Sequence, residues 1–411
     1  MPLRHGNPVV VALILLAPLT ACSVINRISG TDTVDLRRAT LRRMTVSLRK
    51  PEQTICPREQ VQMAVFMTAI PEGANEEKTF ETWAGRGSVN KNDKLEFTDF
   101  TFQSDQGQFD NEGWFAPLQT LPATAGTEFV VHATYTPSPL VFSYTYKWKP
   151  DYACVTSAVS VGTAGASGGR GKDGAPGRGG DGGGVMSAGG DGQDGAPGGP
   201  GTDGTVGAAG PRLHAVVAYV KTPFYEKLIG VRLTGAITDL LLVPPGQPFA
   251  LHVNGGIGGA GGPGGHGGPG GPGSSGNPGG HGANGGPGGA GGHGGNGGPG
   301  GTIDLVYDSR FPDLASAVTL DVNGGAGGAG GPPGPAGDPG PGGKGVAPQN
   351  SPSATVDGAR GHEGDPGAPG AAGHAGAVGV GTGHAGSAGD AFAGVPNVTV
   401  LTSPSAAHTA H

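Results

Sequence analysis

Glycine recurs at every third position through the middle of this chain, and that period fits neither regular secondary structure. From Gly255 to Gly300 every third residue is glycine, and in 13 of these 16 triplets the next residue is glycine as well. An α-helix repeats every 3.6 residues and a strand every two. A period of three matches the left-handed helix of the polyproline II type, which makes no hydrogen bonds within itself. Such a segment needs hydrogen-bonding partners elsewhere.

Glycine on two of the three edges of such a helix lets neighbouring backbones approach and pair N–H with C=O. Alanine, proline, histidine and asparagine occupy the third edge. The sequence therefore predicts a bundle of polyglycine II helices rather than a linker. We expect arms with paired glycines to be central and arms reading Gly-X-Y to be peripheral. The six expected arms are 162–183, 189–210, 255–273, 279–301, 324–345 and 358–389.

Strand-like segments flank the arms, which predicts three hairpins rooted in strands. The segments that lead out and return are 155–161 with 213–220, 249–253 with 303–307, and 318–322 with 398–401. The junction itself is repeated, because Phe249 to Pro263 and Val318 to Pro332 share 11 of 15 residues at an offset of 69. Further strands at 229–233 and 238–243 would complete a second β layer.

The chain before the first arm alternates apolar and polar residues, which is typical of strands with one buried face. Examples are the runs Val61 to Met67, Phe129 to Tyr135 and Phe142 to Trp148. Seven or eight short strands between residues 39 and 161 predict a β-sandwich. The fold class expected for the chain is thus mainly β: a sandwich followed by strand-flanked polyglycine II hairpins.

The first 22 residues read as an export signal, since Arg4 and His5 precede an apolar run too short to span a bilayer. The run ends in Leu19-Thr20-Ala21-Cys22, which resembles the lipobox of bacterial lipoproteins. That resemblance implies a signal peptide over 1–21 and lipidation of Cys22 as the mature N-terminus. Ser23 follows, whereas aspartate there would resemble an inner-membrane retention signal, so the resemblance implies an outer-membrane protein. Residues 22–38 would form the anchor and linker.

Two cysteines remain once Cys22 is assigned to the lipid. An even pair in an exported protein predicts a disulfide between Cys56 and Cys154. Closing a loop of about 100 residues would stabilise the fold by roughly 4–5 kcal/mol in the chain-entropy model.

Charge is divided between the two halves of the chain. Residues 1–150 hold 15 basic and 15 acidic side chains, and the rest hold 10 and 17, so nothing indicates a nucleic-acid partner. A basic run follows the linker and could face anionic lipid head groups or form an outward strand face. It consists of Arg37, Arg38, Arg42, Arg43, Arg49 and Lys50.

Two known classes of glycine-rich protein share features with the arms. Triplets such as those from Gly171 to Pro176 resemble bacterial collagen-like proteins, which implies a trimer. The stretch from Gly255 to Gly301 instead resembles the polyglycine II bundles of certain antifreeze proteins and phage tail-tip adhesins. A second glycine in most triplets and arms of at most eight triplets favour the bundle, and a monomer, over the triple helix.

Few side chains suggest chemistry. The segments Gly168–Pro176 and Gly189–Pro197 resemble a calcium-binding nonapeptide, which would use Asp173 and Asp194; solvated aspartates on a glycine rod are the alternative. Histidines such as His266, His281, His293 and His374 are too dispersed to predict a metal site. No combination of acid, base and nucleophile suggests an enzyme, and no cofactor is expected.

These observations predict a non-enzymatic lipoprotein of the outer membrane with a structural or adhesive role. The layout expected is a sandwich over 39–161, a glycine-rich domain over 162–401 and a tail over 402–411. Its partners would be the membrane, through the lipid, and a glycan or protein at the cell surface. The alternatives are a ligand- or glycan-binding module, supported by the aromatic residues from Phe142 to Trp148, and a collagen-like trimer.

Overall fold

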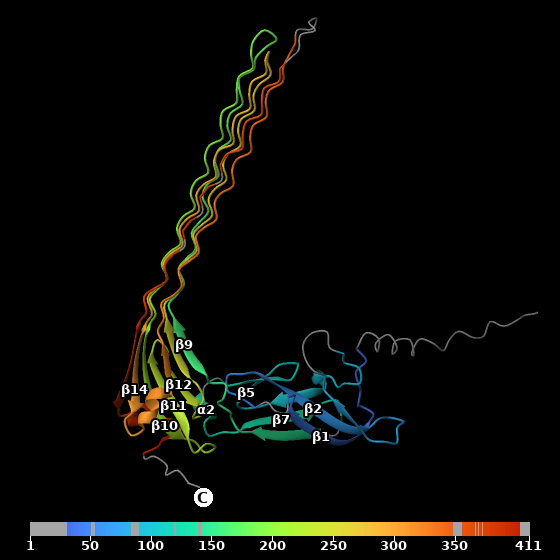
Figure 1. Ribbon diagram of the computed structural model, residues 1–411. Coiled ribbons are helices and arrows are strands. Elements are labelled where there is room, and N and C mark those ends of the chain that lie inside the picture. Colours follow the sequence, from blue (N-terminus) through green and yellow to red (C-terminus); the bar gives the residue numbers. More distant parts are fainter. Residues whose placement is uncertain are drawn as a thin grey trace, which may run out of the picture. The chain divides into compact units, whose positions relative to one another are not determined.

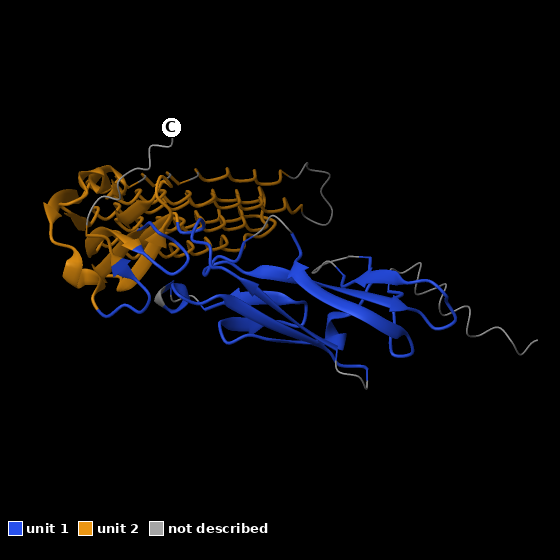
Figure 2. Ribbon diagram, turned by 90° about the horizontal axis from the view of Figure 1, so that it is seen from below, with its two compact units in different colours: residues 1–155, 221–228, 394–399 blue, residues 156–220, 229–393, 400–411 orange. Residues whose placement is uncertain are grey.

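A computed structural model describes residues 31–50, 54–83, 90–118, 121–138, 142–347, 356–365, 367–368, 370–371 and 373–402. The described chain is mainly β, with several antiparallel sheets. It divides into two compact units, coloured separately in Figure 2. Unit 1 contains the residues up to Val155 together with Lys221–Leu228 and Gly394–Thr399, and unit 2 contains Thr156–Val220, Ile229–Ala393 and the residues from Val400.

Unit 1 is built from two antiparallel sheets. The first has the order β1-β2-β6-β5, with β3 also paired to β2, and the second has the order β4-β7-β8. Their bounds are β1 (Thr40–Leu48), β2 (Val61–Ile70), β3 (Lys78–Glu81), β4 (Phe100–Gln103), β5 (Gly107–Phe109), β6 (Trp114–Pro117), β7 (Phe129–Tyr135) and β8 (Phe142–Trp148). The turns η1 (Phe97–Asp99) and α2 (Leu121–Thr124) connect strands.

The two sheets of unit 1 contribute to one hydrophobic core. Alternate residues of β2, from Val61 to Met67, are fully buried, and so are alternate residues of β7, from Phe129 to Tyr135. Both rows belong to a single apolar cluster that also includes Val46 of β1. The period of two read from the sequence therefore identified the core-facing side of these strands.

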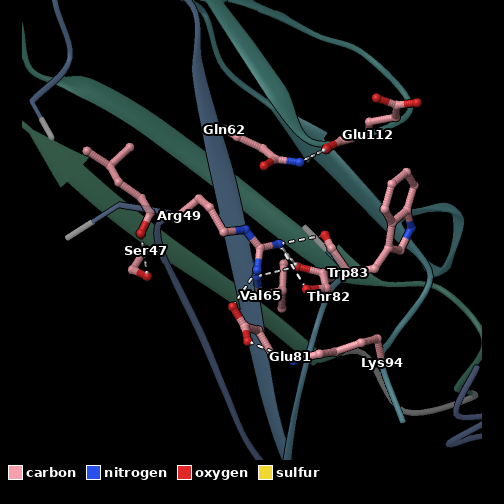
Figure 3. A network of polar contacts seen from close by, with 10 residues as sticks. Ser47, Arg49, Gln62, Val65, Glu81, Thr82, Trp83, Lys94 and Glu112 are labelled. Atoms are coloured by element: carbon pink, nitrogen blue, oxygen red, sulfur yellow. Dashed lines mark hydrogen bonds and ion pairs between the residues drawn. The ribbon is translucent and has the colours of Figure 1, made fainter. Parts of the chain in front are cut away.

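A half-buried arginine ties the end of β1 to the end of β3, as Figure 3 shows. The guanidinium of Arg49 pairs with Glu81 and donates to the carbonyl oxygens of Thr82 (2.9 Å) and Trp83 (2.8 Å). Lys94 joins Glu81 from the other side at 3.2 Å. Burial lowers the pKa of Arg49, and the neighbouring Glu81 opposes that shift.

The predicted disulfide is present in unit 1. Cys56 and Cys154 are bonded across 98 residues, with their Cα atoms 6.1 Å apart. The bond joins the segment before β2 to the segment after β8, so the loop that it closes contains the strands β2 to β8.

Unit 2 gathers the strands before and after the glycine arms into two sheets (Figure 1). The outgoing strands β9 (Ser157–Val161), β13 (Ala250–Asn254) and β15 (Thr319–Asp321) form a parallel sheet. The returning strands β10 (Arg212–Lys221), β14 (Thr302–Asp308) and β16 (Val380–Gly386) are parallel in a sheet of order β12-β11-β10-β14-β16. The strands β11 (Leu228–Gly235) and β12 (Asp239–Val243) extend that sheet, β17 (Thr399–Val400) pairs with β10, and η2 (Pro312–Ser316) and η3 (Gly389–Phe392) are short turns.

The facing sides of these strands are apolar and buried. Leu251 and Val253 of β13 are inaccessible to solvent, as are Ala215 and Val217 of β10 and Ile303 of β14. The strand β11 adds Val231 and Leu233, and β12 adds the four residues from Leu240 through Val243; all of these are almost fully buried. The arms thus start from a packed β base rather than from loose linkers.

The third hairpin returns through a strand that the sequence analysis placed within its last arm. Val380–Gly386 is β16 and pairs with β14, whereas the expected return over 398–401 contains only the two-residue strand β17. The glycine spacing changes from three to two at Gly379, Gly381 and Gly383, which is the period of a strand. A Cβ at Gly381 would come within 3.3 Å of Leu320, so glycine permits close packing there.

Asp308, at the end of β14, should make unit 2 sensitive to acid. Its buried carboxylate accepts from Nε of Arg310 at 2.9 Å and from Nη2 at 2.6 Å, and these hydrogen bonds lower the pKa of Asp308. Because the folded-state pKa is lowered, the pair stabilises fully above the unfolded-state pKa, near 4, and this stabilisation is lost as pH falls through the folded value.

We expect Asp308→Asn to lower stability near neutral pH by about 1.5–3 kcal/mol, the range for hydrogen bonds to charged groups. The deficit should shrink as pH falls below the unfolded-state pKa, near 4. Denaturant unfolding of the full chain at pH 7 and pH 3 measures both, with Asp390→Asn at an exposed site as the control. Equal losses at the two pH values would contradict this role for the pair.

Candidate functional site: the glycine arms

Extended glycine-rich runs of unit 2 lie side by side in Figure 1. We number them arm 1 (162–183), arm 2 (189–210), arm 3 (255–273), arm 4 (279–301), arm 5 (324–345) and arm 6 (358–379). Their hydrogen bonds run between arms at intervals of three residues. In arm 1, Gly162, Gly165 and every third residue to Gly183 donate N–H to carbonyls in and beside arm 3, at 2.7–2.9 Å.

The donors define two rows of parallel arms. Arm 1 donates to arm 3 and arm 3 to arm 5, while arm 2 donates to arm 4 and arm 4 to arm 6. A second set of N–H groups runs antiparallel and joins the rows: Gly256 of arm 3 donates to Ala208 of arm 2, and Gly280 of arm 4 donates to Ser274 beside arm 3. Arms 3 and 4 each bond to four other arms, and arms 1 and 6 to two.

Arms 3 and 4, in which most triplets contain paired glycines, are the two arms with four neighbours. A Cβ built on Gly268 of arm 3 would clash with the carbonyl oxygen of Ala175, and one on Gly286 of arm 4 with that of Ala196. Both contacts would be far closer than real Cβ atoms approach. At Gly182, on the edge of arm 1, the same added atom would meet nothing within 4 Å. Glycine is thus required where a neighbouring backbone lies against the arm.

In part of arm 5 other residues replace the glycines that face arm 6, and the distance between arms 5 and 6 is larger there. Gly324 and Gly327 face arm 6, whereas Pro333, Ala336 and Pro339 occupy equivalent positions further along. The N–H···O distance from arm 6 to arm 5 is 2.8 Å at Gly373 and Gly376, and it rises to 3.3 Å at Gly364, opposite this segment. Side chains in place of glycine therefore push the outermost arm away by a few tenths of an ångström.

Side chains on the third edge complete the hydrogen bonding of the neighbouring arm. In four places an aspartate Oδ1 accepts a backbone N–H: Asp173 from His266 (2.9 Å), Asp191 from His281 (2.6 Å), Asp194 from Asn284 (2.8 Å) and Asp203 from His293 (2.6 Å). Side chains of arm 4 in turn accept backbone N–H groups of arm 6. The four acceptor side chains are those of His281, Asn284, His293 and Asn296, and they bond to the N–H groups of Ala359, His362, Ala371 and His374, respectively.

The two aspartates expected as calcium ligands belong to this set. Asp173 and Asp194 lie on different arms, and each bonds to a backbone N–H of the adjacent arm. The N–H of His266 is the main cause that lowers the pKa of Asp173, and Arg170 adds to it at 2.9 Å. Among the residues that the structure describes, no group of three or more His, Cys, Asp or Glu side chains could hold a metal ion.

Histidine–aspartate pairs at the roots of the arms were not expected from the sequence. Nδ1 of His252 lies 2.6 Å from Oδ2 of Asp321, and this contact, with Asn254, lowers the pKa of Asp321. In the returning sheet, Nδ1 of His214 and of His384 lie 2.9 Å and 3.4 Å from the carboxylate of Asp304. The repeat contained a signal, since its offset of 69 aligns His252 with Asp321, and parallel pairing places them opposite each other.

The aromatic row of β8 is only partly covered. Tyr146 is 37% exposed, and its ring centroid lies 4.1 Å from that of Trp148 and 6.3 Å from that of Tyr144. β8 is the edge strand of its sheet, and Tyr146 pairs with the buried Val131 of β7. The row therefore continues the core face to the open edge, where its rings are not fully packed.

The remaining expectations concern the anchor and the basic run. Cys22 lies outside the described residues. Within those residues, no helix is long and apolar enough to cross a bilayer. Most of the basic run is paired with acid: Arg37 with Asp35, Arg38 with Glu72, Arg42 with Glu77, and Arg49 with Glu81.

Comparisons with known proteins found no relative for this chain. No protein-family model, no curated protein and no solved structure matches it.

Two glycine substitutions should separate crowded from open positions. Gly268→Ala is expected to destabilise the arms by about 1–3 kcal/mol, because the methyl group collides with the carbonyl of Ala175. Gly182→Ala should be neutral or stabilising, since it removes unfolded-state entropy without a clash. Thermal unfolding followed by circular dichroism compares the two. Similar losses in both variants would rule out inter-arm crowding as the reason for glycine.

Proposed function

We propose that this protein is a non-enzymatic structural or adhesive lipoprotein that presents a stiff rod of polyglycine II helices from the outer membrane. The observation that carries the proposal is the continuous ladder of hydrogen bonds between the six arms. Donors recur every three residues in both the parallel and the antiparallel contacts. That spacing supports threefold helices, because only a period of three returns the same N–H to the same edge in every triplet.

Stiffness follows from the density of these bonds. Ordering a residue costs about 1–2 kcal/mol in backbone entropy, and glycine costs the most, so isolated arms would not hold one shape. In arms 3 and 4 most triplets donate two backbone N–H groups, and carbonyls of the same triplets accept others. At about 3.1 Å per residue, an arm of 22 residues would extend roughly 65 Å. A rod of this length suits a spacer or an attachment device.

The anchor is proposed from the sequence, through lipidated Cys22. The pairing of the basic run favours an outward strand face over contact with lipid head groups. Unit 1, proposed as a β-sandwich, would then link the lipid to the rod. A membrane partner through the lipid and a protein or glycan partner at the cell surface complete the proposal, with no cofactor.

The rod proposal is tested on the delipidated full-length protein by sedimentation velocity and small-angle X-ray scattering. We expect a monomer whose maximum dimension includes a rod of roughly 65 Å. A trimer whose stability depends on protein concentration would support the collagen-like alternative and contradict the proposal. Mass spectrometry of the mature N-terminal peptide and protease treatment of intact cells test the lipid on Cys22 and the exposed location.

The exposed part of the aromatic row favours a second candidate function, glycan binding by unit 1. Sugar rings stack on aromatic faces, and Tyr146 with Trp148 offers two adjacent rings at an open sheet edge.

Titration of the full-length protein with a panel of soluble oligosaccharides, followed by tryptophan fluorescence, tests this function. Tyr146→Ala should weaken any binding about two- to tenfold, as expected from the loss of one aromatic contact of roughly 0.5–1.5 kcal/mol. Thr145→Ala, on the opposite side of the same strand, is the control. An affinity that is the same in Tyr146→Ala as in the unsubstituted protein would exclude this surface.

A further inference from the structure

A bundle with a three-residue period has an ambiguity of register. If one arm slides by a triplet, every backbone N–H meets an equivalent carbonyl, so the backbone ladder does not distinguish the two arrangements. The strands fix the register only at the roots. Asp173 is 12 residues from the end of β9, and Asp191 is 21 residues before β10, which corresponds to about 37 Å and 65 Å of extended arm.

Between arms 1 and 3, only the observed register gives Asp173 a backbone N–H to accept, when it is compared with the registers one triplet away. Asp173 accepts the N–H of His266 at 2.9 Å. One triplet away on either side, the equivalent residues are Pro263 and Pro269, which have no N–H to donate. A slip in either direction would therefore leave Asp173 facing a proline.

The contact between arms 2 and 4 follows the same rule with three aspartates. In the observed register Asp191, Asp194 and Asp203 accept from His281, Asn284 and His293. A slip of one triplet toward higher numbers places Asp194 opposite Pro287, and a slip the other way places Asp191 opposite Pro278. Only the observed register gives all three aspartates a donor.

We propose that Asp173, Asp191, Asp194 and Asp203 are positioning residues that set the register of the arms, with third-edge prolines excluding the registers one triplet away. The aspartates supply the favourable contact and the prolines remove the competing donors, so both attraction and exclusion specify one arrangement. The proposal rests on these contacts alone and holds whether or not the rod is adhesive.

Asp338 provides a matched control. It occupies the same third edge, on arm 5, and carries the same charge. Among the described residues arm 5 ends its row, because arm 3 donates to it and its own ladder donors, such as Gly325, bond to arm 4. No described arm lies beyond Asp338 to be positioned by its carboxylate.

Engineered disulfides can report the register of arms 2 and 4 in the full-length protein. Pro200 and Ala290 are opposite each other in the observed register, which the offset of 90 defines. The pair Pro200→Cys with Ala290→Cys reports that register. The pairs Pro197→Cys with Ala290→Cys and Pro200→Cys with Pro287→Cys report slips of one triplet in each direction. A slip moves the partners by about 9 Å along the arm, beyond the reach of a disulfide.

With all aspartates present, only the first pair should cross-link efficiently. Replacing Asp191, Asp194 and Asp203 by alanine should raise the slipped pairs relative to the observed pair by roughly tenfold or more, because each slipped register has one aspartate hydrogen bond fewer than the observed register. Asp338→Ala should leave the ratio unchanged. Peptide mapping under non-reducing conditions gives the yields. An unchanged ratio in the triple variant would overturn the proposal.

A second variant keeps every aspartate and tests the prolines. Pro287→Ala restores an N–H opposite Asp194 in one slipped register, so Pro197→Cys with Ala290→Cys should then cross-link measurably. This variant retains all inter-arm bonds of the observed register, so it remains informative if the triple variant does not fold. If Pro287→Ala shows no slipped product, the role assigned to the prolines is wrong.

Discussion

The structure depends on one interaction, the hydrogen bond from a backbone N–H of one arm to a carbonyl of another. The arms bury few large side chains, so the usual hydrophobic driving force is small there, and the backbone groups find partners only between arms. Glycine follows from this constraint, because a Cβ at Gly268 or Gly286 would occupy the space of the neighbouring backbone. The same constraint explains why arms 3 and 4, which have four neighbours each, carry paired glycines.

The β base determines which arms meet. In the outgoing sheet, Val161 pairs with Asn254, and the next donor, Gly162, bonds to the carbonyl of Asn254, so the sheet ladder continues into the arm ladder. In the returning sheet, the N–H of Thr302 donates to the carbonyl of Pro211, and the N–H of Val380 donates to the carbonyl of Gly301. Parallel strands and parallel arms share one register at their junction. The apolar core of unit 2 thus supplies the stability that holds the ends of the arms together.

Side chains on the third edge of the arms take part in the hydrogen bonding between arms. For example, the side chain of Asp194 accepts the backbone N–H of Asn284, and the side chain of Asn284 accepts the backbone N–H of His362 on the next arm. The charged and polar side chains on this edge therefore have a role within the fold that does not depend on a binding partner. The aromatic row of β8 differs, because its rings extend a buried face to an open edge, and partly exposed Tyr146 is not required by the core.

The sequence alone determined the period, and with it the arms, most of the strands that flank them and the Cys56–Cys154 bridge. These features are local or depend on residue counts, so composition and spacing were sufficient. The strand β16 was not predicted from the sequence, because an isolated change in glycine spacing is a weak signal beside a long run with a period of three. Only the tertiary structure decided which arms are neighbours, that His252 meets Asp321, and that Asp173 bonds to His266, 93 residues away. The physical reason is that a repeating backbone offers many equivalent pairings, and the choice among them lies in contacts between residues far apart in the chain.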